Sequence, residues 1–364
     1  MRKATAHLLA MESLVTIAGT LAGVFGIVFL VNSGFSLFEA SLFYLAGFVT
    51  ACMLAVAFAS KGFGRPRRWM AFGMVSVSVF YLSFVLLDGY WLLLFASVFF
   101  GFYIVCFWVP FNVLMLRTTS RKGRGEAIGY YFLVFPLIGL ASPIAGGYLI
   151  DHVGYAFLFI CAFLTLLCNA LLIFLSPSTV SRPMKGRLTI RRMRPRLALG
   201  FFFEGGQEGI WMPAVALISM VFVQGEANLG YLFALFALLG GMASIIVARW
   251  SDRRGKRHLY VTAAAIIAAF FIWGAAMAPD VSWFLLFTCG VYLAQPMLAI
   301  LLFAMASDRM ERQKVSCSLT RELLLNAGRI FGGAVCALVL FQTGDVRLAY
   351  ALSGAMLLGV SLTR

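Results

Sequence analysis

Long apolar segments recur along this chain at short intervals. A helix that crosses a lipid bilayer needs about 20 mostly apolar residues, and twelve segments of that kind are present. Lipid accepts only helices or closed barrels as spanning structures, and these segments lack the apolar/polar alternation of barrel strands. We therefore expect an all-α polytopic membrane protein. The twelve predicted transmembrane helices cover residues 8–32, 38–60, 69–87, 90–116, 126–150, 154–175, 197–223, 228–248, 259–278, 281–306, 319–342 and 346–362.

The composition excludes a protein that folds in water. Of the 364 residues, 62% are hydrophobic and 12% are charged, and the mean hydropathy is +0.95. A soluble domain has roughly 45–50% apolar and about 25% charged residues, so the polar residues needed to cover a water-soluble core are missing. A soluble enzyme, a nucleic-acid binder and a disordered scaffold are excluded together. The lipid bilayer is the expected surrounding.

Basic residues mark alternate connections between the predicted helices. All of the 29 lysines and arginines except Arg329 and Arg347 lie near the two ends of the sequence or in every second connection. Cytoplasmic loops of membrane proteins carry an excess of Lys and Arg. We therefore expect both termini and every basic connection in the cytoplasm, and the protein in the inner or plasma membrane. The net charge of +15 then reflects topology. The opposite connections contain Glu39, Asp88, Asp151, Glu226, Asp280 and Asp345.

The longest polar interruption, residues 176–196, divides the twelve helices into six and six. We interpret it as a cytoplasmic linker between an N-terminal half, 1–175, and a C-terminal half, 197–364. Weak internal similarity supports a repeat, because the fifth helix of each half carries a Gly-Gly pair, Gly146-Gly147 and Gly332-Gly333. Two six-helix halves in parallel repeat are an architecture of secondary transporters.

Two motifs indicate a family. Residues 250–257 read Trp-Ser-Asp-Arg-Arg-Gly-Lys-Arg, and residues 142–147 read Ser-Pro-Ile-Ala-Gly-Gly. The chain resembles the major facilitator superfamily over essentially its whole length. The first motif resembles that family's signature loop, and the second is similar to an element of its exporters. In three places the chain departs from the family. Lys61 replaces the Asp of the first-half loop, Ser142 stands where Gly is usual in the second motif, and Ser97 stands where proton-coupled members often carry an arginine.

The resemblance implies roles for both motifs. The signature loop would help to close the cytoplasmic side as a gate loop, and the second motif would pack helices closely. The residues concerned are Asp252, Arg253, Gly255, Lys256 and Arg257 for the gate loop, and Pro143, Gly146 and Gly147 for the helix-packing motif.

Charged residues inside predicted membrane helices are candidates for function, since each costs at least about 2.5–3.5 kcal/mol at the membrane centre on insertion scales. On the seventh helix, Glu204, Glu208 and Trp211 follow i, i+4, i+7 spacing and share one face. At about 1.5 Å per residue from Arg196, the two carboxyls lie roughly 12 Å and 18 Å along the helix. This depth favours a site within the membrane.

The eleventh helix supplies a complementary charge. Glu322, Asn326 and Arg329 share a face of that helix, and Arg329 is at a depth comparable to Glu208. We hypothesise that Glu204 or Glu208 titrates as substrate or protons pass, with Arg329 as the switching partner. The alternative is a static ion pair that fixes helix packing. Glu12, on the first helix, is a further candidate, or else a residue near the headgroups.

The resemblance implies a central cavity made by the first, fourth, seventh and tenth helices. Aromatic residues form 15% of the chain, which favours an amphipathic substrate recognised by ring stacking and a few hydrogen bonds. Packing and lipid contact also explain many aromatic residues. The predicted cavity-lining residues are Tyr103, Trp108, Asn112, Gln207, Trp211, Tyr292 and Gln295.

These features predict a monomeric secondary transporter that works by alternating access, and not an enzyme. Because the candidate carboxylates are present and no GxxxxGK[ST] phosphate-binding motif occurs, we expect proton coupling. We expect no cofactor, no metal and no nucleic-acid partner. Export of an amphipathic small molecule is favoured. The alternatives are proton-coupled uptake of a small solute, a lipid or glycolipid flippase, and a transport-inactive membrane scaffold or sensor.

Overall fold

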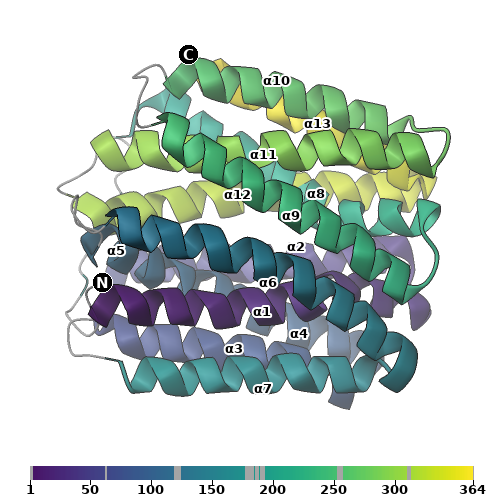
Figure 1. Ribbon diagram of the computed structural model, residues 1–364, viewed down its shortest axis with the longest axis horizontal. Helices are drawn as coiled ribbons and strands as arrows, with labels where there is room; N and C mark the ends of the chain where they lie inside the picture. The colour runs from purple at the N-terminus through teal and green to yellow at the C-terminus, as the bar shows by residue number, and fades with distance from the viewer. Residues whose placement is uncertain are drawn as a thin grey trace.

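A computed structural model describes residues 3–61, 64–118, 124–176, 184, 188, 193–251, 257–309 and 313–363. The described residues are almost all helical, and the helices run along a common direction (Figure 1). The helices are α1 (Lys3–Asn32), α2 (Leu37–Lys61), α3 (Pro66–Leu86), α4 (Gly89–Cys106), α5 (Trp108–Thr118), α6 (Arg124–Val153), α7 (Tyr155–Phe174), α8 (Pro195–Phe222), α9 (Glu226–Ser251), α10 (Arg257–Ala276), α11 (Val281–Arg309), α12 (Lys314–Thr343) and α13 (Val346–Val360), followed by the 3₁₀ turn η4 (Ser361–Thr363).

The predicted fourth transmembrane segment, 90–116, is present as one membrane span, Gly89–Met115. Its helix is broken at Phe107 into α4 and α5. Pro110 explains the break, because its ring nitrogen has no hydrogen to donate to the carbonyl of Cys106 and its ring crowds that carbonyl. Gly73 of α3 lies against the backbone of Phe107 at the break. The remaining predicted helices are present, with ends shifted by several residues.

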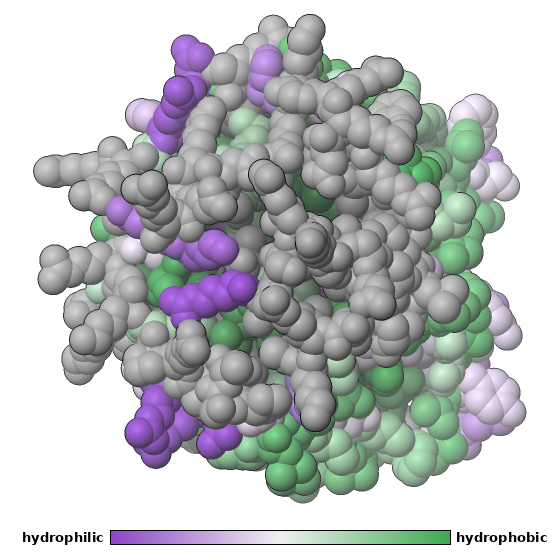
Figure 2. All heavy atoms as spheres, turned by 60° about the vertical axis from the view of Figure 1, so that its left-hand side comes forward, coloured by the Kyte–Doolittle hydropathy of each residue, from purple (hydrophilic) through white to green (hydrophobic). Residues whose placement is uncertain are grey.

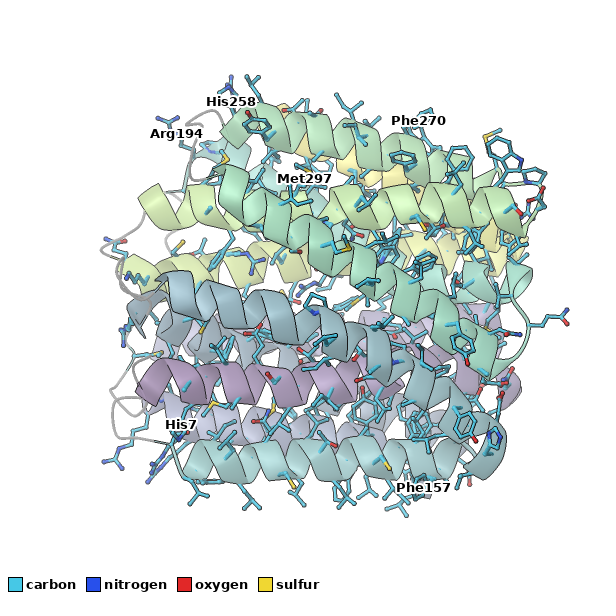
Figure 3. All side chains as sticks on the ribbon, viewed as in Figure 1. His7, Phe157, Arg194, His258, Phe270 and Met297 are labelled. Atoms are coloured by element: carbon cyan, nitrogen blue, oxygen red, sulfur yellow. The ribbon has the colours of Figure 1, made fainter. Side chains whose placement is uncertain are left out.

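The flanks of the bundle are apolar. Phe157 on α7 and Phe270 on α10 point away from the bundle on opposite sides (Figure 3) and are 44% and 62% exposed. In the described part of the chain, nine helices are long and apolar enough to cross a membrane when α4 and α5 are counted together. Side chains with this exposure are stable in hydrocarbon and unfavourable in water. The predicted all-α polytopic membrane fold is confirmed.

The two ends of the bundle differ in charge. We call the end where α1 begins the basic end, and the end where α1 finishes the acidic end. Both termini lie at the basic end (Figure 1), and hydrophilic side chains lie around it while hydrophobic ones cover the flank (Figure 2). The basic end holds Lys61, Arg65, Arg117, Arg194 and Arg196, and the acidic end holds Glu39, Asp88, Asp151, Glu226, Asp280 and Asp345.

Helices α1–α7 and α8–α13 meet mainly along two pairs of neighbours. Helix α2 packs against α12, and α6 packs against α9. Residue 184 of the segment between these two groups is tied to the first group, since the backbone N–H of Met184 donates to the carbonyl of Gly64 at 2.9 Å. The Met184 side chain is fully buried. The connection therefore packs onto the basic end at this point.

Glycines set the distance between α8 and α12. Gly205 and Gly209 of α8 lie against backbone carbonyls of α12, and Gly328 and Gly332 of α12 lie against backbone carbonyls of α8. A Cβ atom at any of these positions would overlap the partner backbone. Small residues of this kind let membrane helices approach closely. The α8–α12 crossing therefore depends on having no side chain at the contact.

Adjacent glycines of α12 test this dependence. We expect Gly332→Ala to lower the free energy of unfolding by about 1–3 kcal/mol, because its methyl group would meet the Gly206 backbone. Gly333→Ala is the matched control, since its Cβ would make only ordinary contacts with Leu45. Thermal unfolding of the purified variants measures both. Equal effects of the two substitutions would contradict the proposed role of the crossing.

Candidate functional site

The α8–α12 crossing brings a partly buried arginine onto a glutamate. The guanidinium of Arg329 donates from Nε to Glu208 Oε2 at 2.7 Å and lies with Nη2 at 2.6 Å from the same oxygen. The side chains are 14% and 25% exposed. Gly209, next to Glu208, lies against the Arg329 carbonyl. The close helix approach therefore places the two charges in contact.

A second carboxylate shares the same arginine. Arg329 Nη1 donates to Glu322 Oε1 at 2.9 Å and to Asn326 Oδ1 at 3.0 Å. Asn326 Nδ2 in turn donates to the Glu322 backbone carbonyl at 2.9 Å and to its carboxylate at 3.2 Å. The one-face spacing on α12 thus produces a connected group. We call Glu208, Glu322, Asn326 and Arg329 the α8–α12 charge cluster.

Glu204 lies one turn from Glu208 on α8 and is 4% exposed. Among the described residues, neither of its carboxylate oxygens has a hydrogen-bond partner. The charged groups near enough to influence it are Glu208 on α8, and Arg321, Glu322 and Arg329 on α12. The site therefore combines a bonded acid and an unbonded acid on the same helix.

The charged side chains of the α8–α12 charge cluster depend on one another for their stability. Removing one partner of a buried ion pair leaves an uncompensated charge in a medium that solvates it poorly. Arg329 also lies over the ring of Phe48 on α2, with its guanidinium carbon 5.8 Å from the ring centre. That contact crosses from the second group of helices to the first. A change in the charge state of the cluster would therefore act on the contact between the two groups.

A cavity of about 380 Å³ lies beside α8. Six helices line it: α1, α2, α3, α4, α7 and α8. Two of the predicted cavity residues, Tyr103 and Trp211, are among its walls. The lining consists of Val15, Gly19, Gly23, Val24, Ile27, Tyr44, Val77, Phe80, Tyr81, Phe100, Tyr103, Leu166, Trp211, Met212, Val215 and Ala216.

Three predicted cavity residues on α8 and α11 contact other groups and lie outside this lining. Gln295 Nε2 donates to Gln207 Oε1 at 3.2 Å, which joins α11 to α8. The ring of Tyr292 is 5.6 Å from that of Trp211 and stacks on Phe236 at 4.7 Å. These contacts hold α8, α9 and α11 together behind the cavity wall.

The remaining predicted site residues on α1 and α5 also lie outside the lining. The ring of Trp108 lies edge-on to that of Tyr103, which is in the wall, with the ring centres 6.2 Å apart. Asn112 is partly exposed on α5. Glu12 is buried on α1, at 7% exposure. Trp108 thus packs against a cavity residue from outside the lining.

The predicted helix-packing motif contacts two different helices. Gly146 lies against the Leu21 carbonyl of α1, whereas Gly147 lies against the backbone of Glu226 on α9. The carbonyl of Pro143 meets Gly230 of α9. The motif therefore packs α6 both within the first group of helices and against the second.

The predicted gate loop falls largely beyond what the structure describes. Asp252, Arg253, Gly255 and Lys256 lie outside the described residues, and Arg257 is the first residue of α10. Among the described residues, no group of three or more His, Cys, Asp or Glu side chains is placed to hold a metal ion.

A polar cluster at the acidic end joins the two groups of helices. Glu226 Oε1, at the start of α9, accepts hydrogen bonds from Tyr155 Oη at 2.8 Å and from Asn32 Nδ2 at 3.1 Å. Asn32 Nδ2 also donates to Tyr155 Oη at 3.1 Å. We call these three residues the outer clasp. Spacing along the chain gave no signal for it, because the residues come from three separate helices.

The family follows from comparison with known proteins. A model of the Major Facilitator Superfamily matches residues 6–196, more than half of the chain. The uncharacterised protein YqgE of Bacillus subtilis (strain 168) is 28% identical over 291 residues. That match covers 72% of this chain and 65% of the relative, so the chain covers less than two thirds of the relative's length.

Solved structures of transporters share the fold. The human organic anion transporter MFSD10 matches with a TM-score of 0.70 and 14% identity, over 100% of this chain and 99% of that one. A bacterial homolog of the human lysosomal transporter Spinster matches with a TM-score of 0.65 and 15% identity, over 99% of this chain and 92% of that one. A POT family transporter in complex with 5-aminolevulinic acid matches with a TM-score of 0.72 and 13% identity, over 98% of this chain and 94% of that one.

The chain belongs to the Major Facilitator Superfamily. Its fold is that of the superfamily's membrane transport proteins.

The charge cluster yields a stability prediction. We expect Arg329→Gln to lower the free energy of unfolding by about 3–5 kcal/mol, because Glu208 and Glu322, of which Glu322 is buried, lose their cationic partner. Adding Glu208→Gln to that variant should restore part of the loss. Thermal unfolding of the single and double variants measures the coupling. Strictly additive losses would show that the two side chains do not stabilise each other.

Proposed function

We propose that this protein is a proton-coupled secondary transporter that works by alternating access. The observation that supports this best is that two carboxyls one turn apart on α8, Glu208 and Glu204, differ in their hydrogen bonding. Arg329 holds Glu208, while Glu204 has no hydrogen-bond partner among the described residues. Burial without a partner penalises the charged form of a carboxyl group, so a proton is best accommodated there.

The proposed coupling uses competition for one arginine. Glu208 and Glu322 both bond Arg329, and they approach it from different helices. Protonation of Glu208 would remove the charge that attracts Arg329 and leave the guanidinium on Glu322, within α12. A proton on Glu204 would reduce its repulsion of Glu208. The ion pair between α8 and α12 would thus be made or released as the proton moves.

Alternating access would proceed by rocking of α1–α7 against α8–α13. The outer clasp joins the two groups at the acidic end, and the acidic-end half of α8, residues 213–219, is buried throughout. In this state the acidic end is closed between the groups. Opening that end would require the clasp to break.

The orientation and direction of transport are also part of the proposal. The segregation of basic residues supports placing the basic end in the cytoplasm of a cell membrane. The exporter-like motif on α6, whose Gly147 packs on α9, favours export. An apolar and aromatic cavity beside α8 is consistent with an amphipathic small molecule.

Proton coupling can be tested by replacing both carboxyls. We expect candidate substrates to drive proton movement into or out of proteoliposomes containing the wild-type protein, read with a trapped pH-sensitive dye. Glu204→Gln and Glu208→Gln together should reduce this movement at least about tenfold, because no carboxyl remains on α8 to carry the proton. Glu39→Gln is the control, as this carboxyl lies on α2 at the acidic end, where it accepts hydrogen bonds from Ser36 and Tyr90. Undiminished proton movement and unchanged pH dependence in the double variant would exclude the coupling mechanism.

The outer clasp yields a conformational prediction. We expect Tyr155→Phe to raise the population open at the acidic end roughly three- to tenfold, since Glu226 loses a hydrogen bond. Spin labels on cysteines placed at the exposed positions Ser33 and Asn228, in a background without the native cysteines, report the separation. Tyr148→Phe is the control, because this ring lies on α6 outside the clasp. An unchanged distance distribution in Tyr155→Phe would show that the clasp does not hold this end closed.

A further inference from the structure

The wall of the cavity beside α8 carries no side chain that is charged at neutral pH. None of the residues lining it is Asp, Glu, Lys, Arg or His. The α8–α12 charge cluster is on the same helix, but Glu208 and Arg329 are not part of the wall. Glu12 of α1 acts electrostatically on Tyr103 but does not line the cavity. A bound ion in this cavity would therefore lose its hydration without touching a charged side chain of the wall. That loss is large in an apolar medium.

Four lining residues carry side-chain hydrogen-bonding groups, namely three tyrosines with hydroxyls and Trp211 with an indole N–H. Tyr44, Tyr81 and Tyr103 come from α2, α3 and α4. No described residue forms a hydrogen bond with the Tyr44 or Tyr81 hydroxyl, so both remain available to a ligand.

Aromatic rings form much of the remaining wall. Phe80 and Phe100 lie 5.6 Å apart at an interplanar angle of 37°, and Trp211 approaches from α8. Ring faces of this kind favour flat apolar groups by offset stacking or edge contacts. A volume of about 380 Å³ is within the range of about 300–1,000 Å³ that small-molecule sites have.

We propose that this cavity binds an uncharged molecule with a flat, apolar body and one or two hydrogen-bonding groups. The inference names the substrate class for the proposed transport function and rests on it. The aromatic wall holds the apolar body, and the hydroxyls of Tyr44, Tyr81 and Tyr103 bond its polar groups. Proton and substrate then occupy separate places, with α8 as the element common to both.

Two fluorescent probes with the same aromatic body test whether the cavity selects an uncharged molecule over a charged one. N-phenyl-1-naphthylamine is neutral, and 1-anilinonaphthalene-8-sulfonate adds an anionic group to it. With the full-length protein in lipid nanodiscs, we expect saturable binding of the neutral probe and at least about tenfold weaker binding of the anion. Tetraphenylphosphonium, a cation, should not displace the neutral probe. Equal binding of the anion, displacement by the cation, or no saturable binding of the neutral probe would overturn the proposal.

A cavity-filling substitution locates the binding. Gly19 of α1 is in the wall, and a Cβ there would meet nothing within 4 Å. Gly19→Leu should therefore occupy the cavity without displacing a helix and weaken binding of the neutral probe at least about tenfold. Gly19→Ala, which fills little space, is the matched control and should retain binding. Unchanged binding in Gly19→Leu would place the probe elsewhere.

The hydroxyl groups are tested separately. The triple variant Tyr44→Phe, Tyr81→Phe and Tyr103→Phe keeps the rings and removes the hydrogen-bonding groups. It should weaken binding of the neutral probe several-fold and leave the melting temperature of the protein nearly unchanged. A triple variant that folds and binds the neutral probe as the wild type does would exclude recognition by these hydroxyls.

These equilibrium measurements need no proton gradient. They can fail while Glu204- and Glu208-dependent proton movement persists, in which case only the substrate class is wrong. If binding follows the expected pattern and proton movement survives in the double carboxyl variant, the coupling mechanism is wrong and the substrate class stands.

Discussion

The close approach of α8 and α12 determines where charge can lie in this protein. Four glycines allow the two backbones to touch, and only at that distance can the short Glu208 side chain reach Arg329 with two short contacts. A charge in a membrane helix is unfavourable unless it is paired. The glycine contact is thus the condition under which Glu208 and Arg329 are tolerated. Both the packing of α8 on α12 and the Glu208–Arg329 contact therefore depend on the same glycine contact.

Periodicity accounts for what could be predicted from the sequence. The length of the apolar segments predicted the helices. The spacing of Glu322, Asn326 and Arg329 predicted that they share one face of α12, and their hydrogen bonds agree with this. The break at Phe107 was missed because apolar length alone does not register the hydrogen bond that Pro110 cannot make. Local patterns are informative where one helix carries the whole feature.

Features assembled from several helices were not accessible in the same way. The outer clasp takes Asn32, Tyr155 and Glu226 from α1, α7 and α9. Glu226 looked like one more acid in an outward-facing connection, and nothing in its neighbourhood along the chain distinguishes it. The cavity is similar, because Tyr44 and Tyr81 join Tyr103 only through packing of α2, α3 and α4. Such groups depend on helix arrangement, which no single-segment pattern encodes.

Helix α8 belongs to both candidate sites. Glu208 bonds α12, while Trp211 and Met212, three and four residues further on, line the cavity on the side of α1–α4. Residues at these spacings lie about one turn apart on a stiff helix. A shift of α8 against α12 would therefore displace Trp211 in the cavity wall. Coupling would need no contact between proton and substrate, since one helix would transmit the change from the charge cluster to the cavity.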